Sequence, residues 1–454
     1  MILKYLLIAL AILIVITASD PYFGTDLTHP KMPEDTKGDV RELSWMSTDA
    51  FKDYLMDHDD RVDDVFEITP FYYPNVHFWF LIYTQFESTQ VVIHDKENLS
   101  LIYKILDFSS LQEKEMSRNV ISVVQRKLTD EKVTSIKKEL DLLIKNPFSL
   151  EPGAKDIYRI LKHSNISLPL KKLDRAAFFR EMRDNIRSQT GQKNYIREGV
   201  IRSLPYQPFL SKYFKGKNLP PELLAIPFLE SSFNTRAESK VGALGVWQFM
   251  PLISSFYVPK RTQNIDYRSN VGTASVAAAY LMSENFKIMK SWDLAVTAYN
   301  SGTKHLLKTK REIASSDVDL EAIIKHSDSA HFGFASKNFY SEFLALTRTL
   351  AYREELFEGI HKHDRYNVDE DLRFFMTKCS LRLDKALNDK QLDDVEFHNT
   401  QIRDYKYTYP RGLIVTAKET LPKNKFLELP FEKILKLKPK DWSKILGNQS
   451  CSTR

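Results

Sequence analysis

The chain is organised around one stretch, Pro220-Pro221-Glu222-Leu223-Leu224-Ala225-Ile226-Pro227-Phe228-Leu229-Glu230-Ser231-Ser232-Phe233-Asn234. Two prolines suit the start of a helix, where the missing N–H would have no partner in any case. The residues that follow are too apolar for a surface helix and predict a buried one. Pro227 lies inside this segment, and its missing N–H predicts a kink or a late helix start just before Glu230.

Glu230 is a candidate general acid. A carboxyl at the C-terminal end of a buried helix meets a low dielectric and the negative end of the helix dipole, and both favour its protonated form. Protonation of a glycosidic oxygen near neutral pH requires such an acid. A glutamate in this position can also simply cap or pair at a helix end, so this stretch alone leaves both roles open.

The bulk composition is that of an ordinary globular protein. The chain has 454 residues, enough for two or three domains. Its formal net charge is +6, with acidic and basic residues interspersed. That charge gives no basis for nucleic-acid binding and only weakly favours an anionic polymer or surface as a partner.

The N-terminus predicts export. Lys4 precedes an unbroken apolar run, Tyr5 to Ile16, which ends in Thr17-Ala18-Ser19. A positive start, an apolar core and small residues after it are typical of a secretory signal. The run is short for a membrane span, and the cleavage sites are only fair, so residues 1–19 are either a cleaved signal or an uncleaved membrane anchor. Both alternatives place the protein in the periplasm or cell envelope, or outside the cell.

The two cysteines, Cys379 and Cys451, could pair in an oxidising compartment. Cys451 sits in a polar tail that is expected to be loose, so no structural disulfide is predicted. Two isolated cysteines make no metal site, and the 11 histidines show no paired spacing. No metal or other cofactor is therefore expected.

The predicted fold class is α+β, mainly α. A linker at 20–40 precedes a mostly helical, aromatic-rich region at 41–200, which is expected to pack on the next domain. The aromatic runs near 71–83 suit a core better than a sugar-binding platform, and residues 188–193 are expected to form a turn or a capped connection. Residues 201–360 predict a compact helical domain, 365–432 a small α+β module, and 433–454 a basic tail.

Several motifs follow Glu230 in the sequence and bear on its function. Glu230-Ser231-Ser232-Phe233-Asn234 is followed by Ser239, by Gly242-Ala243-Leu244-Gly245-Val246-Trp247-Gln248-Phe249-Met250, and by Ala298-Tyr299-Asn300-Ser301-Gly302. In this order the set resembles the soluble lytic transglycosylases, the goose-lysozyme-like enzymes that cut the glycan strands of peptidoglycan. With Arg187 to Gln192 and Pro227-Phe228-Leu229 it is most similar to their membrane-bound D type. The resemblance covers residues 185–355 and implies a lysozyme-like fold for 201–360.

The resemblance implies roles for particular positions. Glu230 matches the sole catalytic acid and base. Five other positions match residues that orient the glutamate, line the sugar subsites or close the site: Ser231, Gln248, Met250, Tyr299 and Asn300.

One position departs from the family's pattern. The family often places a tyrosine near the glutamate from a later helix, in an Asn-Tyr pair, whereas here Asn338 is followed by Phe339 and then Tyr340. Either Phe339 replaces that tyrosine without its hydroxyl, or Tyr340 serves in its place as a substrate-binding residue after a small shift of register.

The implied reaction cleaves the β-1,4 bond between N-acetylmuramic acid and N-acetylglucosamine and forms 1,6-anhydromuramic acid. One carboxylate suffices, because the C6 hydroxyl of the same sugar replaces an enzyme nucleophile or an attacking water, whereas ordinary glycosidases use two. Near the motifs no second acid stands out. Glu222 suits a helix start, Glu238 an exposed turn, and Asp266 a salt bridge or helix cap.

Two alternative functions remain. One is a hydrolytic lysozyme on the same fold. The other is a non-catalytic peptidoglycan-binding or scaffold protein. In all three cases the partner is the peptidoglycan glycan strand, and the sequence does not determine an oligomeric state.

The C-terminal module resembles a degenerate LysM domain, a peptidoglycan-binding unit. The resemblance rests on a strand-helix-helix-strand pattern and on Leu381, Leu387, Asn399 and Gly412. A plain helical appendage is the alternative, since no internal repeat is visible. The lysines after 432 suit either contact with an anionic envelope polymer or simple solvation.

Overall fold

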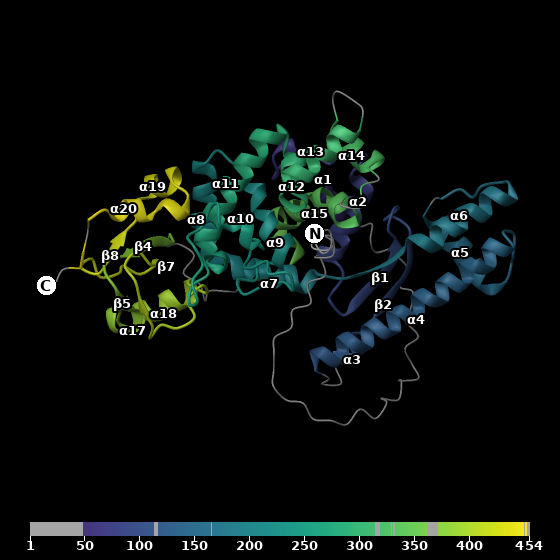
Figure 1. The fold of residues 1–454 in the computed structure, drawn as a ribbon. Helices are drawn as coiled ribbons and strands as arrows, with labels where there is room; N and C mark the ends of the chain where they lie inside the picture. The colour runs from purple at the N-terminus through teal and green to yellow at the C-terminus, as the bar shows by residue number, and fades with distance from the viewer. Residues whose placement is uncertain are drawn as a thin grey trace, which may run out of the picture. The chain divides into compact units, whose positions relative to one another are not determined.

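The computed structural model describes residues 49–112, 117–164, 166–313, 318–327, 329, 332–360, 371–448 and 450–451. The predicted signal or anchor and the linker at 20–40 lie outside these residues. The described chain is mainly helical with three small sheets (Figure 1), so the predicted fold class is confirmed. None of the helices in the described ranges is both long and apolar enough to cross a bilayer.

The described residues form two compact units. The smaller unit contains 49–61 and 68–195, and the larger contains 62–67 and all described residues from 196 onward.

The smaller unit is built on an antiparallel sheet of order β2-β1-β3. Its strands are β1 (Gln90–Asp95), β2 (Ile102–Asp107) and β3 (Ile186–Thr190), and its helices are α1 (Asp49–Met56), α2 (Tyr73–Thr84), α3 (Ser109–Gln112), α4 (Arg118–Lys145), α5 (Pro152–His163) and α6 (Lys172–Asn185). Phe78, Trp79, Phe80 and Tyr83 of α2 are buried, which confirms core packing. The turn expected at 188–193 is wrong in its first half, because residues up to Thr190 pair with β1, a contact that local sequence does not specify.

The larger unit begins with a helical domain. Its helices are η2 (Asp64–Phe66), α7 (Lys193–Ser203), η3 (Leu204–Tyr206), α8 (Gln207–Gly216), η4 (Pro221–Ala225), α9 (Ile226–Ser231), α10 (Pro251–Ser254), η5 (Tyr267–Ser269), α11 (Val271–Met289), α12 (Trp292–Ser301), α13 (Thr303–Glu312), α14 (Leu320–His326), α15 (Phe334–Ala351) and α16 (Arg353–Leu356). Most of the alanine-rich α11 is buried, because small side chains let neighbouring helices approach closely.

The C-terminal module contains the predicted strand, two helices and strand, with two further short strands: β5 (Leu381–Arg382), where the sequence pattern predicts the start of the first helix, and β6 (Thr408–Tyr409) after the helices. β4 (Arg373–Thr377) lies between β7 (Ile414–Ala417) and β8 (Phe426–Glu428), antiparallel to both. The two helices are α17 (Leu383–Ala386) and α18 (Asp389–His398). The LysM resemblance stays a prediction.

This module packs tightly against the helical domain. The fully buried Asn270 amide, which precedes α11, donates to Gln401 Oε1 at 3.1 Å and to Thr416 Oγ1 at 2.9 Å. Gly272 leaves no room for a side chain, since a Cβ there would lie 2.7 Å from Phe374 Cζ. The polar network and the close approach make the module part of the same compact unit.

The C-terminal residues are anchored. They form α19 (Phe431–Lys436), η7 (Pro439–Asp441) and α20 (Ser443–Leu446). Trp442 is fully buried, and its ring packs edge-on against Phe374 with centroids 5.1 Å apart.

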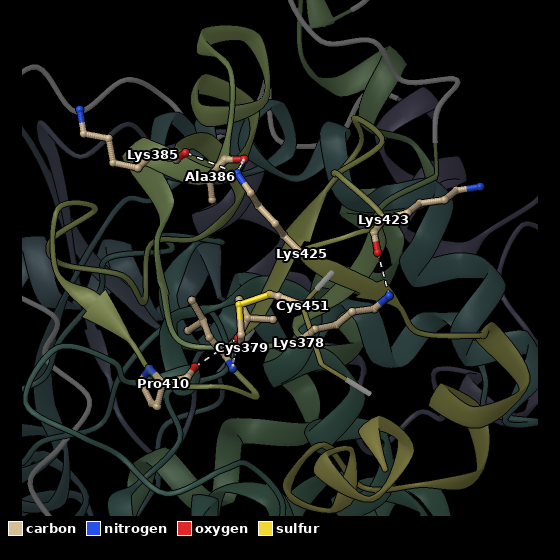
Figure 2. The surroundings of a disulfide bond; sticks show 10 residues. Lys378, Cys379, Lys385, Ala386, Pro410, Lys423, Lys425 and Cys451 are labelled. Atoms are coloured by element: carbon tan, nitrogen blue, oxygen red, sulfur yellow. Dashed lines mark hydrogen bonds between the residues drawn. A yellow bond between two sulfur atoms is a disulfide. The ribbon is translucent and has the colours of Figure 1, made fainter. Parts of the chain in front are cut away.

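The expectation of no disulfide is wrong: Cys379 and Cys451 are bonded, with Cα atoms 5.5 Å apart (Figure 2). The polar composition around Cys451 suggested a loose end. Burial of Trp442, nine residues before it, instead holds this end beside β4, and only the tertiary packing shows this.

Candidate active site

Glu230 lies in the last turn of the short helix α9. The 3-10 helix η4 comes first and α9 begins at Ile226, so Pro227 falls in the first turn, where its missing N–H breaks no helical bond. The predicted late helix start is confirmed. Ser232 and Phe233 both have positive φ, 49° and 55°, so the chain turns sharply directly after Glu230.

The end of α9 is held by α7. A Cβ at Gly199 would lie 2.5 Å from the Ser232 carbonyl oxygen, so only glycine permits this approach. Arg202 Nη2 donates to the same oxygen at 2.7 Å. These contacts fix the backbone two residues beyond Glu230.

The Glu230 carboxyl has a pKa raised to about 8, first by burial and second by the negative charge of Glu342. Both causes disfavour the carboxylate. Glu342 comes from α15, which packs against α9, and its side chain is buried. The site therefore has an acid that is largely protonated at neutral pH and a second acid within its electrostatic reach.

Glu342 is not among the predicted site residues, because it lies far along the chain from the motifs around Glu230. The signal that could have revealed it is its place in a helical pattern. Phe339, Glu342 and Leu346 recur at i, i+3 and i+7, so the glutamate occupies a core position of an amphipathic helix.

The helical geometry of α15 shows which of Phe339 and Tyr340 lies on the same side of the helix as Glu342. At about 100° per residue, Phe339 lies about 60° from Glu342 around the helix and Tyr340 about 160° from it. Tyr340 is buried and stacks on Phe343, and burial and Asp293 raise its pKa. Phe339 thus shares the Glu342 side of α15, and Tyr340 faces away from it.

Tyr299 and Asn300 end α12 in different surroundings. The Tyr299 hydroxyl donates to the Trp247 carbonyl at 2.6 Å. Burial and the neighbouring Glu230 raise its pKa well above the usual value, which places this phenol within electrostatic reach of the acid. Asn300 Oδ1 accepts a hydrogen bond from Ser336 Oγ at 3.0 Å and so connects α12 to α15.

The glycine-rich loop is bonded to α9 through Ser231. The buried Ser231 hydroxyl lies 3.0 Å from both the Pro227 and Val246 carbonyl oxygens and accepts from the Asn234 amide at 3.1 Å. Ser231 is thus bonded only to backbone groups, and it positions the loop relative to Glu230.

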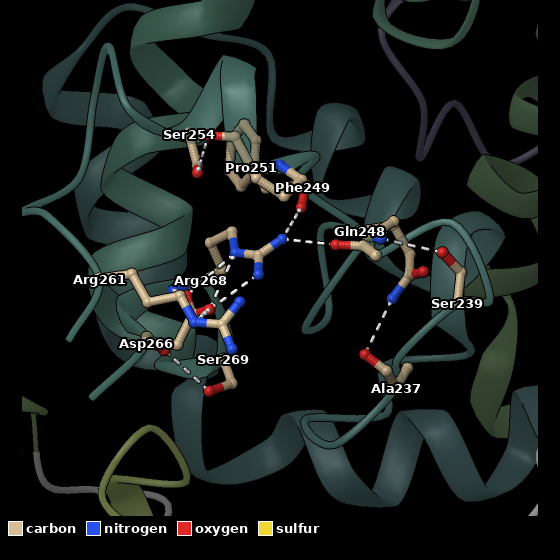
Figure 3. A network of polar contacts seen from close by, with 12 residues as sticks. Ala237, Ser239, Gln248, Phe249, Pro251, Ser254, Arg261, Asp266, Arg268 and Ser269 are labelled. Carbon is tan, nitrogen blue, oxygen red and sulfur yellow. Dashed lines mark hydrogen bonds and ion pairs between the residues drawn. The ribbon is translucent and has the colours of Figure 1, made fainter. Parts of the chain in front are cut away.

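Gln248 has a left-handed backbone, φ 46°. Its side-chain amide donates to the Ala237 carbonyl at 3.2 Å (Figure 3) and to the Gly245 carbonyl at 2.9 Å. These bonds close the turn on which Gln248 sits. Met250 follows with an exposed side chain. The contacts described here bring Glu230, Ser231 and Tyr299 together with the turn that carries Gln248, whereas none of them places Met250, Asn300 or Tyr340 beside Glu230.

Asp266 is bonded within the scaffold. It caps η5 and forms a buried ion pair with Arg268, with Nη2 to Oδ2 at 2.7 Å (Figure 3). The predicted salt bridge and cap are confirmed. Glu222 accepts from the Asp63 amide at 3.1 Å, and Glu238 is exposed. Within the described ranges, no three His, Cys, Asp or Glu side chains group as a metal site requires.

Residues 208–320 match the family described as Transglycosylase SLT domain. The predicted family resemblance is confirmed. Over 130 residues of this chain the identity is 35% to the membrane-bound lytic murein transglycosylase D of Escherichia coli K12 and to its counterpart in E. coli O6:H1. This match covers 28% of the chain and 29% of each E. coli protein, so less than a third of those relatives is spanned.

A further relative is a protein of Alteromonas sp. (strain M-1) named for tributyltin chloride resistance. It is 32% identical over 108 residues, which cover 24% of this chain and 52% of that protein. The SLT region contains Glu230, Ser231, Gln248, Met250, Tyr299 and Asn300, whereas Tyr340 and Glu342 lie beyond its end at residue 320.

Proposed function

We propose that this protein is a peptidoglycan lytic transglycosylase in which Glu230 is the single acid and base. The observation that carries the proposal is a carboxyl with a pKa raised to about 8, at a rigid helix end inside the SLT region. A group with this pKa can give a proton and take one back near neutral pH.

Glu230 donates its proton to the oxygen between N-acetylmuramic acid and N-acetylglucosamine. The muramyl N-acetyl group stabilises the positive charge that develops as this bond breaks. The Glu230 carboxylate then takes the proton of the C6 hydroxyl while that oxygen bonds to C1, which closes the 1,6-anhydro ring. Tyr299, which is bonded to the Trp247 carbonyl, and the Gln248 turn, which Ser231 joins to α9, are proposed to contact the sugars.

We also propose that the protein works outside the cytoplasm. The disulfide between Cys379 and Cys451 supports export, since disulfides persist in oxidising compartments such as the periplasm. The apolar N-terminal run supports it independently.

Mass spectrometry of the products from purified peptidoglycan tests the activity. We expect anhydromuramic ends from the wild type and almost none from Glu230→Gln, whose amide cannot donate a proton as an acid. Reducing muramic acid ends would identify a hydrolytic lysozyme instead. Equal release of muropeptides by the wild type and Glu230→Gln would reject Glu230 as the catalytic group, and no release by either under conditions where both bind would favour the scaffold alternative.

A further inference from the structure

Exposed apolar side chains gather beside the Gln248 turn. Val241, Leu252, Ile253 and Phe256 are exposed, as is Met250; Leu252 is 71% and Phe256 54% exposed. No other stretch of this length in the described ranges exposes more than three large apolar side chains. We call the first four residues, with Lys240 and Lys260, the loop surface.

Rigid backbone holds these side chains outward. Arg268 Nη1 donates to the Gly242 carbonyl at 2.6 Å and to the Phe249 carbonyl at 2.8 Å, so one guanidinium joins the two turns that carry Val241 and Leu252. Its buried partner Asp266 fixes that guanidinium (Figure 3). The exposure is therefore a property of the fold, since internal bonds prevent these turns from folding inward.

The underside of the same segment is anchored in the core. Ser254, Tyr257 and Val258 are buried, and they alternate with the exposed residues around α10 and the turn after it. Ile253 and Phe256 cannot exchange places with them without breaking this packing. The segment is thus amphipathic, with one face in the protein and the other in solvent.

The segment that carries the loop surface has a net positive charge. From 236 to 261 the exposed charged residues are Arg236, Lys240, Lys260 and Arg261 against Glu238, four basic minus one acidic, or +3. Arg261 is paired with Asp266 at 3.5 Å, which leaves Lys240 and Lys260 as the cations that flank the apolar residues. Between these two lysines the sequence up to Pro259 has no charged residue at all.

We propose that the loop surface docks on an anionic phospholipid bilayer. Leucine, isoleucine and phenylalanine gain by entering the boundary between headgroups and acyl chains, while flanking lysines contact anionic headgroups. A polar glycan offers no comparable apolar phase for a leucine as exposed as Leu252, so lipid fits the surface better than the wall polymer does. Docking would set the Gln248 turn beside the membrane, and it requires no particular reaction at Glu230.

A local fluorescent probe tests the proposal in the full-length protein with its disulfide intact. Ser255, exposed between Ile253 and Phe256, is replaced by cysteine and labelled with an environment-sensitive dye; Lys304→Cys on α13 carries the control label. We expect vesicles containing phosphatidylglycerol to blue-shift and brighten the probe at 255 severalfold. Phosphatidylcholine vesicles should do much less, and the probe at 304 should not respond.

The N-terminal apolar run is present in every variant. A difference in probe response between variants therefore reports the contribution of the loop surface alone. Leu252→Ser/Phe256→Ser should abolish the response at 255, and Lys240→Gln/Lys260→Gln should weaken it at least threefold and remove most of its salt dependence. These residues are exposed, so an unchanged melting temperature will verify the fold. No response to anionic vesicles, a response that survives Leu252→Ser/Phe256→Ser, or a response only to purified peptidoglycan would overturn the proposal.

Discussion

At the scale of single residues, the environment of Glu230 decides the chemistry. Burial and the charge of Glu342 act in the same direction, and together they raise its pKa to about 8. The sequence indicated the first cause through the apolar run before Glu230. It did not indicate the second, because Glu342 lies 112 positions later (342 − 230) and reaches the site only through the packing of α15 on α9.

Glu342→Gln should shift the pH dependence of activity. A general acid works while it is protonated, so kcat/KM of the wild type should fall as pH rises through about 8. Removing the charge of Glu342 lowers the pKa of Glu230, and the alkaline limb should therefore move to lower pH. Burial remains, so the limb should stay above the ordinary glutamate range. The profile is measured as product release from purified peptidoglycan.

The matched control for that experiment is Glu238→Gln, which removes an exposed acid in the same domain. Its alkaline limb should coincide with that of the wild type. An unshifted limb in Glu342→Gln would show that the charge of Glu342 does not act on Glu230.

Glu230→Gln should stabilise the protein at neutral pH. The folded pKa of this acid is raised, so the folded state binds more protons than the unfolded state between about 4.5 and 8, and stability falls as pH rises through that window. A neutral glutamine avoids this cost, which we expect to be about 1–3 kcal/mol at pH 7.

Chemical denaturation at several pH values measures that difference in the free energy of unfolding. The gain should disappear below about pH 4, where the glutamate is protonated in both states. Equal stability of the two proteins at pH 7 would contradict a strongly raised pKa.

At the scale of elements, the glycine-rich loop depends on one backbone approach. Gly245 has φ 78°, and a Cβ there would overlap the Arg268 carbonyl oxygen. The motif predicted a loop that lines sugar subsites. In the structure, the Arg268 side chain also donates a hydrogen bond to the Phe249 carbonyl of this loop, and the Ser231 hydroxyl bonds the Val246 carbonyl of the loop to α9.

Gly245→Ala should destabilise the protein by about 3 kcal/mol or more, because it adds a clash with rigid backbone to the strain of positive φ. Gly412→Ala is the matched control. Its φ is 91° with no atom within 4 Å of the added Cβ, so only the strain of about 1–2 kcal/mol should appear. Thermal and urea unfolding compare the two variants. Equal losses would show that the loop relaxes around the clash.

The register of α15 is a second element-scale result. The sequence left Phe339 and Tyr340 as alternatives, since a one-residue shift exchanges them. The charge of Glu342 acts on Glu230, so Glu342 identifies the side of α15 that faces Glu230. With 3.6 residues per turn, Phe339 lies on that same side of the helix. A helix turns by a fixed angle per residue, so one placed residue determines the directions of its neighbours.

At the scale of the whole molecule, the C-terminal module and the helical domain form one compact unit. The Asn270 network makes this contact, and Trp442 packs the C-terminal residues against Phe374 of β4; neither follows from local composition. The disulfide closes the module over a sequence separation of 72 residues.

Cys379→Ser/Cys451→Ser should lower the free energy of unfolding by about 2–5 kcal/mol, because the cross-link restricts the unfolded chain over a long loop. Differential scanning calorimetry measures the change. Reductant should lower the melting temperature of the wild type towards that of the variant and leave the variant unchanged. A variant as stable as the oxidised wild type would show that the buried Trp442 alone holds this end of the chain.

The sequence by itself determined what depends on neighbouring residues. Pro220 to Glu230 specified a late, buried helix that ends in an acid, and helical spacing located α11, α12 and α15. The ordered motifs gave the family resemblance over residues 185–355, and the family match over 208–320 confirms it.

Tertiary structure alone decided what depends on distant residues: Glu342 beside Glu230, Arg268 beneath the glycine-rich loop, and Cys451 bonded to Cys379. Propensity and periodicity are set within a few residues along the chain. These three contacts arise when helices and strands pack, and packing is decided by shape and burial over the whole molecule.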